Sequence, residues 1–239
     1  MYQIAILMYH KVGAPVVAKR DRFLNVQAAT FARQMRALDR LGFRALTLAE
    51  AATAVRDGKP LPRRAVCYTF DDAYRCVYDF AAPILARRGH PATVYVPTAR
   101  VGDANRWDAS HGVPVLPIMG WEELQALQDA GWEVGGHTRT HPRLGDLADD
   151  AATDEIAGGL SDLETVLGRQ ARTFCYPYGS RNERTHDLVS EAGYVAACTT
   201  VSGMAGPASD PFLLPRVKVA YRDGVIGLLY RLLIRPHLP

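Results

Sequence analysis

The sequence predicts a single-domain α/β protein whose parallel strands close into a barrel. Short apolar runs alternate with segments of helical periodicity along most of the 239 residues, and parallel strands need such helical crossovers. No Gly/Ser-rich linker or low-complexity tract divides the chain, so we expect one domain over residues 1–239. Seven or eight strand–helix units at this length favour a barrel, and an open doubly wound sheet is the alternative that the pattern leaves.

The expected strands are compact runs of apolar, β-branched and aromatic residues. The run AVCYTF at 65–70 is typical of them, because it mixes these residue types over six positions. The expected strand ranges are Gln3–Met8, Phe43–Leu46, Ala65–Phe70, Ala92–Val96, Trp132–Val134, Thr173–Tyr176 and Tyr194–Thr199.

The expected helices show apolar residues three or four positions apart, and several end at a glycine. Phe31, Met35, Leu38 and Leu41 mark the first such helix, which Gly42 ends. Two local signals refine the pattern. Thr47 and Glu50 have the spacing of a capping box before a helix over Ala51–Val55, and Pro83 predicts a break or kink within Tyr74–Arg88. The other helical ranges are Glu122–Ala130, 156–167, Glu183–Ala192 and Val225–Ile234.

Composition excludes several classes of protein. The formal net charge is only +3, so nothing suggests a nucleic-acid-binding surface. The chain is 48% hydrophobic, which is ample for a buried core and argues against general disorder. No apolar run approaches the ~20 residues that a transmembrane helix needs.

Cysteine usage and the amino-terminal residues both favour the cytoplasm. The four cysteines form no CxxC pair, so we interpret them as free thiols rather than as a zinc ribbon or a disulfide scaffold. The stretch Met1–His10 has no basic region and no small-residue cleavage site, and it is more typical of a strand than of a signal peptide.

The apolar run Val225–Ile234 near the carboxyl terminus contains one basic residue, Arg231. A packing helix is the better interpretation of this run. The alternative is a helix that makes a weak contact with a membrane surface or a partner, since an apolar face with a basic residue is the minimal signal for such binding.

Polar residues follow several of the expected strands. His10 comes after the first strand, Asp71 and Asp72 after the third, and His137 after the fifth and a Gly-Gly step. The motif Tyr-Pro-Tyr-Gly ends the sixth strand and includes Tyr178. Because the carboxyl ends of parallel strands meet on one face, which holds the active site in such folds, we expect these residues to be neighbours.

Two of these groups have the chemistry of a metal site. His137 and His141 form an H-x3-H pair, and two imidazoles with one carboxylate make a zinc-type catalytic site with an open position. Asp71 and Asp72 place two carboxylates side by side, and a nearby cation would keep both ionised. The structural alternatives are a helix N-cap for an aspartate and hydrogen-bonded packing residues for the histidines, His10 included.

The segment Thr98–Gly120 has no periodicity and is expected to be a long loop, which is usually functional or mobile at this length. Within it, Trp107 and Asp108 could line a sugar groove, or Trp107 could simply anchor the loop. Arg216 lies in a later segment and could pair either with a site carboxylate or with surface acids.

Three motifs together resemble a known family. Thr-Phe-Asp-Asp at 69–72, His-Thr-Arg-Thr-His-Pro at 137–142 and Phe-Cys-Tyr-Pro-Tyr-Gly at 174–179 resemble the polysaccharide deacetylases, also called the NodB-homology or carbohydrate esterase 4 family. The segments Met8–His10 and Pro211–Val217 resemble a subgroup that includes deacetylases of poly-N-acetylglucosamine.

The resemblance implies a distorted (β/α) barrel of the NodB-homology type and metal-dependent deacetylation of acetylated sugars or polysaccharide. By position, Asp71 corresponds to the general base, and Asp72, His137 and His141 to the ligands of a divalent metal ion, for which Zn²⁺ is expected and Co²⁺ or Ni²⁺ are alternatives. In the subgroup a Tyr-His near the amino terminus supplies the general acid, and His10 matches it.

The resemblance also implies an oxyanion donor, and this sequence differs from the family motifs at two positions. Tyr178 would offer its backbone N–H to the oxyanion. Many members have an arginine where Cys175 stands, and Arg216 is our candidate to replace it. Ala73 stands where a glycine commonly follows the two aspartates.

Two other functions stay open at this point. One is a small-molecule amidase that uses the same metal site, and the other is a carbohydrate-binding protein without catalysis. The acidic pair and the histidine pair argue against the second, because a binding module has no need of them.

Overall fold

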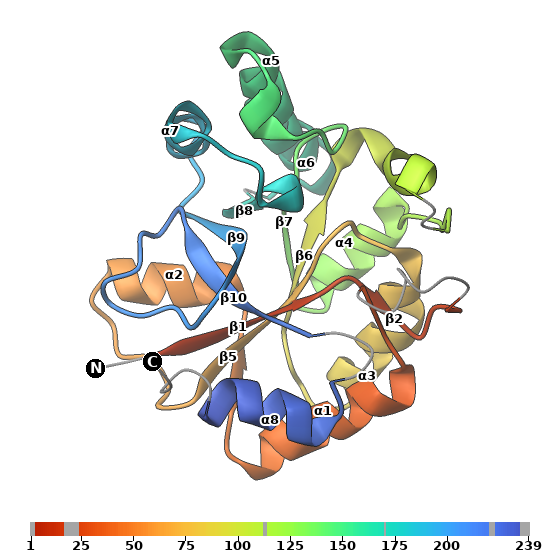
Figure 1. The fold of residues 1–239 in the computed structure, drawn as a ribbon, viewed down its shortest axis with the longest axis vertical. Coiled ribbons are helices and arrows are strands. Elements are labelled where there is room, and N and C mark those ends of the chain that lie inside the picture. Colours follow the sequence, from red (N-terminus) through yellow and green to blue (C-terminus); the bar gives the residue numbers. More distant parts are fainter. Residues whose placement is uncertain (1–2, 17–23, 112–113, 170, 220–222, 235–239) are drawn as a thin grey trace.

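The computed structural model describes residues 3–16, 24–111, 114–169, 171–219 and 223–234, with the side chains of 110 and 111 left out. Its centre is a parallel β-barrel surrounded by helices (Figure 1). The main strands are β1 (Ile4–Tyr9), β4 (Arg44–Leu46), β5 (Ala65–Phe70), β6 (Thr93–Val96), β7 (Glu133–Gly136), β8 (Thr173–Cys175), β9 (Ala196–Ser202) and β10 (Leu214–Lys218). Two short strands, β2 (Lys11–Val12) and β3 (Asn25–Val26), pair separately.

The helices largely follow the predicted order. They are α1 (Ala28–Arg40), α2 (Leu48–Arg56), α3 (Ala82–Ala86), α4 (Trp121–Asp129), α5 (Asp149–Thr153), α6 (Gly159–Leu167), α7 (Glu183–Glu191) and α8 (Val225–Leu233). π-Turns precede α3 over Val77–Ala81 and α6 over Asp154–Gly158. The backbone is not broken at Pro83: Ala81 and Ala82 keep helical φ/ψ, and the π-turn passes directly into α3. Proline, which has no N–H for the helical ladder, lies in the first turn of α3, where it is tolerated.

Strand β5 closes the barrel. Along one edge it pairs with β1 from Ala65 to Phe70, and its other edge is divided between β4 over 65–67 and β6 over 69–70. Seven strands therefore form the closed circle, in the order β1, β5, β6, β7, β8, β9, β10 and back to β1, while β4 adds an eighth strand outside it. The predicted barrel is confirmed, and the boundary of one domain over 1–239 stays a prediction.

The sequence prediction was incomplete for the last strand. Leu214–Lys218 forms β10, which pairs with β9 and β1, whereas we expected no strand there. Its sequence, LPRVK, contains a proline and two cations, so it lacks the continuous apolar character that marks the other strands.

The strand residues alternate between the barrel interior and the helical layer. In β5, Ala65 and Cys67 belong to the interior cluster, while Val66, Tyr68 and Phe70 pack with the helices. Helix α2 contributes Leu48 and Ala51 to the interior cluster, which places this helix at the amino ends of the strands. The apolar filling is thus at the amino end, and the carboxyl end is left for polar residues.

Helix α8 packs beside α1 along the edge of the barrel (Figure 1). Leu228 and Leu232 are buried, whereas Ile226, Tyr230 and Leu233 are exposed. The helix expected at Val225–Ile234 is therefore present and packs through one face. The contact with a membrane or partner that was its alternative role stays a prediction. Within the described ranges, no helix has both the length and the apolar character for crossing a bilayer.

Candidate active site

The carboxyl ends of β1, β5, β7 and β8 bring the predicted site residues together. Asp71 and Asp72 follow β5, His137 follows β7, and His10 follows β1. Asp71, Asp72, His137 and His141 are all buried, although they lie outside regular strands and helices. We expected the carboxyl ends of the parallel strands to bring these distant residues together. Their contacts confirm this, because His10 lies beside Asp71 and the two other histidines lie beside Asp72.

Alternation in β5 directs Asp71 into the barrel. Ala65 and Cys67 point inward, Thr69 donates a hydrogen bond to the Leu7 carbonyl at 2.9 Å, and Asp71 is the next residue in this series. Asp72 follows with a φ of 70°, so the chain turns sharply just after the strand. The two adjacent carboxylates consequently face different partners.

Asp72 forms a cluster with two histidines. The Nε2 atoms of His137 and His141 lie 3.3 Å and 3.1 Å from Asp72 Oδ1. All three potential ligand atoms lie within 4.8 Å of one another. Carboxylate oxygen and imidazole nitrogen are the donors that zinc-type catalytic sites use.

The proton on His137 shows that the cluster suits a cation. His137 Nδ1 lies 2.6 Å from the Cys175 carbonyl, which can only accept, so Nδ1 carries the hydrogen. In the neutral ring, Nε2 then presents a lone pair toward Asp72 Oδ1. Two electron-rich atoms at this separation need a positive charge between or on them, and a divalent cation would supply it.

The electrostatics of Asp72 agree with this interpretation. Burial by itself would raise the pKa of Asp72, but the neighbouring imidazoles of His137 and His141 hold it well below its usual range. The carboxylate therefore stays ionised, which a metal ligand requires.

The backbone around the cluster is strained. Asp72, Ala73, Thr138, His141 and Tyr178 have φ between 52° and 70°, and they are all of the non-glycine residues with positive φ in the described ranges. Each such residue costs of order 1 kcal/mol or more, so the rest of the fold must hold it in place. Strain confined to the loops after β5, β7 and β8 marks this end of the barrel as functional.

Asp71, the other of the two adjacent carboxylates, is held by Arg216. Arg216 Nη1 and Nη2 donate to Oδ1 and Oδ2 of Asp71, both at 2.7 Å. Burial would raise the pKa of Asp71, but the adjacent guanidinium lowers it below its ordinary value. His10 Nε2 lies 3.7 Å from Asp71 Oδ2, on a ring whose pKa burial lowers.

Every nitrogen of the Arg216 guanidinium has a partner. Nε donates to the Thr199 carbonyl at 2.8 Å. Besides their bonds to Asp71, Nη1 donates to Thr69 Oγ1 at 3.0 Å and Nη2 donates to Cys175 Sγ at 3.2 Å. Arg216 is fully buried. Of the two predicted alternatives for Arg216, the structure therefore supports the pairing with a site carboxylate, directly beside Cys175.

The long segment between β6 and α4 supplies the rim of the site. It contains 3₁₀ turns over Thr98–Arg100 and Arg106–His111. The Trp107 ring stacks on His141 with a centroid distance of 4.6 Å, and Tyr178 donates its hydroxyl hydrogen to Asp108 at 3.2 Å. The Tyr178 ring also packs edge-on with the His141 ring. The structure therefore brings the two residues that were predicted for a sugar groove, Trp107 and Asp108, into contact with His141 and with Tyr178 respectively.

Gly135 and Gly136 make room for two tyrosines. A Cβ at Gly135 would lie 2.8 Å from the Tyr95 ring, and one at Gly136 would overlap the Tyr194 hydroxyl. The Gly-Gly step before His137 is thus required by close packing on both faces of β7.

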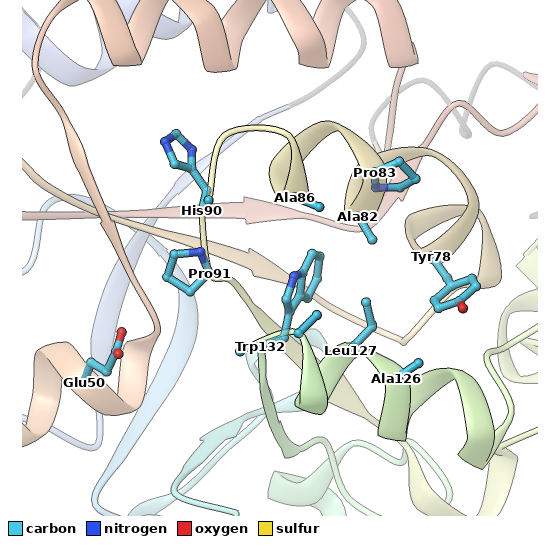
Figure 2. Close-up of a pocket in the computed structure, with 13 residues that line it drawn as sticks. Glu50, Tyr78, Ala82, Pro83, Ala86, His90, Pro91, Ala126, Leu127 and Trp132 are labelled. Carbon is cyan, nitrogen blue, oxygen red and sulfur yellow. The ribbon is translucent and has the colours of Figure 1, made fainter.

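A separate hollow of about 690 Å³ lies between α3 and α4. Figure 2 shows Trp132, Leu127 and Tyr78 around it. Trp132 precedes β7, so this hollow lies toward the amino ends of the strands, and no predicted site residue lines it.

Comparison with known proteins identifies the family. The family model for polysaccharide deacetylase matches residues 58–197, which is more than half of the chain. The chain belongs to the polysaccharide deacetylase family. The matched range includes Asp71, Asp72, His137 and His141, whereas His10 and Arg216 lie outside it.

Individual relatives agree with this assignment. A poly-beta-1,6-N-acetyl-D-glucosamine N-deacetylase of Staphylococcus aureus (strain MRSA252) is 26% identical over 212 residues, which cover 85% of this chain and 70% of the relative. The Streptococcus pyogenes deacetylase PplD, solved in complex with acetate, has a TM-score of 0.82 at 24% identity, covering 96% and 97% of the two chains.

IcaB from Ammonifex degensii has a TM-score of 0.80 at 24% identity, covering 95% of this chain and 96% of the other. These structural likenesses confirm the distorted barrel that the motifs implied. Family membership confirms the prediction of a deacetylase enzyme. The family is metal-dependent, and the Asp72–His137–His141 cluster is a group that could hold the ion.

Three residues that complete the site of this polysaccharide deacetylase were not predicted as site residues from the sequence. Cys175 was noted only for its departure from the family motif, yet its carbonyl orients His137 and its sulfur accepts from Arg216. Arg143, whose guanidinium lies 4.6 Å from the Tyr178 ring centroid, gave no signal in the sequence. Glu155, which contacts the segment between the two histidines, gave none either, because an acidic residue in a helix normally indicates a solvated face.

Proposed function

We propose that this chain is a metal-dependent N-deacetylase that hydrolyses the acetamido group of N-acetylated sugars to acetate and a free amine. The observation that carries the proposal is the position of Asp71. It is a buried carboxylate held at 2.7 Å by Arg216, beside the Asp72–His137–His141 cluster and 3.7 Å from His10. This arrangement supports a general base next to a metal site with an acid on its other side.

Asp72, His137 and His141 would hold the ion, for which Zn²⁺ suits the oxygen and nitrogen donors, while Co²⁺ and Ni²⁺ accept the same set. When bound, the ion would polarise the acetyl carbonyl and lower the pKa of water. The carboxylate of Asp72 is ionised for this task because its two imidazole partners keep its pKa low.

Asp71 accepts the proton of the attacking water. Its two hydrogen bonds to Arg216 fix the plane of the carboxylate and keep it ionised. His10 donates a proton to the nitrogen as the C–N bond breaks, so that the amino sugar leaves as a neutral amine. The backbone N–H of Tyr178 donates to the oxyanion, and one such donor contributes about 3 kcal/mol in other enzymes.

The substrate class that we propose is an N-acetylglucosamine oligomer or polymer. Trp107 and Tyr178 offer aromatic rings at the rim, on which the faces of sugar rings can pack. Asp108 beside the Tyr178 hydroxyl adds a polar group at the same edge. The Staphylococcus aureus relative, whose name gives poly-beta-1,6-N-acetyl-D-glucosamine as its substrate, supports the same class.

The test is acetate release by the Zn²⁺-loaded protein from N-acetylglucosamine oligomers of increasing length, with N-acetylated amino acids and cyclic amides as small amides. The proposal expects release from the oligomers that rises with their length, stops after chelation and returns with Zn²⁺. The Asp71→Asn variant is the matched control for contaminating deacetylases. Faster hydrolysis of small amides, or no acetate from any glycan by metal-loaded protein, would overturn the proposal.

A further inference from the structure

The segment that contains the two histidines, residues 137–142, is held from outside by helix α6 and the π-turn before it. We call this segment the histidine loop. It contains two residues with left-handed backbone, Thr138 with a φ of 65° and His141 with a φ of 67°. Because such backbone is unfavourable for residues with a side chain, contacts with the rest of the fold must maintain it.

Glu155 makes three hydrogen bonds to the middle of the histidine loop. Its Oε2 accepts from the backbone N–H groups of Arg139 and Thr140, both at 2.8 Å, and its Oε1 accepts from Thr140 Oγ1 at 2.5 Å. An ionised carboxylate is a strong acceptor for backbone N–H groups. Glu155 therefore fixes the two peptide units that separate His137 from His141.

The opposite side of the loop is held by residues that follow β6. The N–H groups of Thr98 and Ala99 donate to the carbonyls of Thr138 and Arg139 at 3.1 Å and 2.9 Å. The loop is thus clamped between these backbone N–H groups on one side and the Glu155 carboxylate on the other.

The helix backbone comes unusually close at the same place. A Cβ on Gly159 would lie 3.2 Å from the carbonyl carbon and oxygen of Thr138, and one on Gly158 would lie 2.9 Å from Arg139 Cδ. Glu155 itself lies in the π-turn Asp154–Gly158, a local widening of the helix that often occurs at functional sites. The two glycines let this turn approach closely enough for the Glu155 carboxylate to reach the loop.

We infer that Glu155 is a positioning residue that sets the spacing of His137 and His141 and so raises the affinity of the site for its divalent ion. The inference rests on the proposed function in one respect, namely that these histidines bind a metal. It concerns only groups of this chain, because Glu155 contacts the loop backbone and not the cluster of ligand atoms.

The experiment measures the Zn²⁺ affinity of metal-free protein by competition with a chromophoric chelator, without any activity assay. Loss of an outer partner of metal ligands typically weakens metal binding about 10- to 100-fold, and we expect that loss for Glu155→Ala. Glu155→Gln should stay within a few-fold of the natural protein, because its amide oxygen accepts both N–H groups and its NH₂ donates to Thr140.

Asp154→Ala is the matched control. Asp154 lies in the same π-turn and carries the same charge, but it contacts the Arg139 side chain and not the loop backbone. We expect unchanged Zn²⁺ affinity for this variant. If Glu155→Ala does not fold, Glu155→Asp replaces it, since aspartate is one methylene too short to keep the three bonds and should weaken binding where Glu155→Gln does not.

Each outcome has a distinct meaning. Equal Zn²⁺ affinity in the natural protein and Glu155→Ala would overturn the inference, and so would an equal loss in Asp154→Ala, which would indicate the charge of the turn instead of its hydrogen bonds. A natural protein that binds no Zn²⁺ at all would instead remove the proposed function, and the inference would fall with it.

Discussion

Arg216 and Asp71 form a buried ion pair with two hydrogen bonds inside the barrel, with both N–O distances at 2.7 Å, although 145 positions separate them in the sequence. Strand β10 supplies the arginine and the end of β5 supplies the aspartate. Because Arg216 is fully buried and all its nitrogens have partners, neither member of the pair can be removed without leaving an unpaired group.

Arg216→Met should therefore destabilise the fold. It leaves the Asp71 carboxylate buried without its partner, and loss of one member of a buried pair costs about 3–5 kcal/mol. We expect that decrease in the free energy of unfolding from urea denaturation of metal-free protein at pH 7.

The double variant Asp71→Asn/Arg216→Met isolates the interaction from the loss of side-chain volume. It should be more stable than the sum of the two single changes predicts, because no unpaired charge is left. Strict additivity would contradict the assigned role of the pair.

Asp71→Asn and Asp72→Ala should separate the two carboxylates by function. Asp71→Asn should keep Zn²⁺ and lose about 10²- to 10⁴-fold in kcat, the typical contribution of a general base. Asp72→Ala should lose Zn²⁺ and acetate release together. Metal analysis alongside kinetics checks both, and full turnover by Asp71→Asn would show that another group is the base.

Trp107 should report metal binding through its fluorescence, because its ring stacks on His141 at 4.6 Å. We expect Co²⁺ to quench the emission of metal-free protein, since an open-shell ion quenches an indole at short range. Trp107→Phe should remove most of this quenching, whereas the control Trp121→Phe should retain it. Quenching that survives in Trp107→Phe would place the ion elsewhere.

Glu133 should make stability depend on pH. Burial raises the pKa of Glu133, although the hydroxyls of Thr173 and Thr93 and the Ala49 N–H favour the ionised form. A carboxyl whose folded pKa is raised stabilises the fold below its unfolded pKa and loses that contribution as pH rises through the folded pKa. The loss is about 1.4 kcal/mol for each pH unit that separates the folded pKa from the unfolded pKa.

Glu133→Gln mimics the protonated side chain, so its stability relative to the natural protein should increase between pH 4 and pH 7. Urea denaturation across this range measures the difference, and Glu122→Gln, at an exposed glutamate, serves as the control for the same substitution outside the core. A difference that is constant with pH would show that Glu133 titrates normally.

The sequence predicted the barrel and most of the site because both follow from local patterns. Alternation in β5 directs Asp71 inward, and the common direction of parallel strands brings His10, Asp71 and His137 to one end. The spacing of His137 and His141 predicted a pair of metal ligands without any knowledge of the loop geometry, and the structure brings both rings to Asp72.

Other features depend on tertiary contacts that no local pattern contains. The strand that carries Arg216 is hidden because LPRVK has too few apolar residues, and its partner Asp71 comes from a distant segment. Glu155 appears as a solvated helix residue until the close approach of Gly159 to Thr138 is seen. Strand β4, which lies outside the closed circle, cannot be told from a barrel strand by its sequence. Its position depends on how one edge of β5 is divided between β4 and β6.

The most direct test of the central claim is a Zn²⁺ titration of metal-free protein, compared with the same titration of His137→Ala. We expect one tightly bound ion per chain in the natural protein, none in the variant, and acetate release that rises in proportion to the bound ion. Full acetate release by protein that holds no divalent metal, or equal Zn²⁺ binding by His137→Ala, would contradict it.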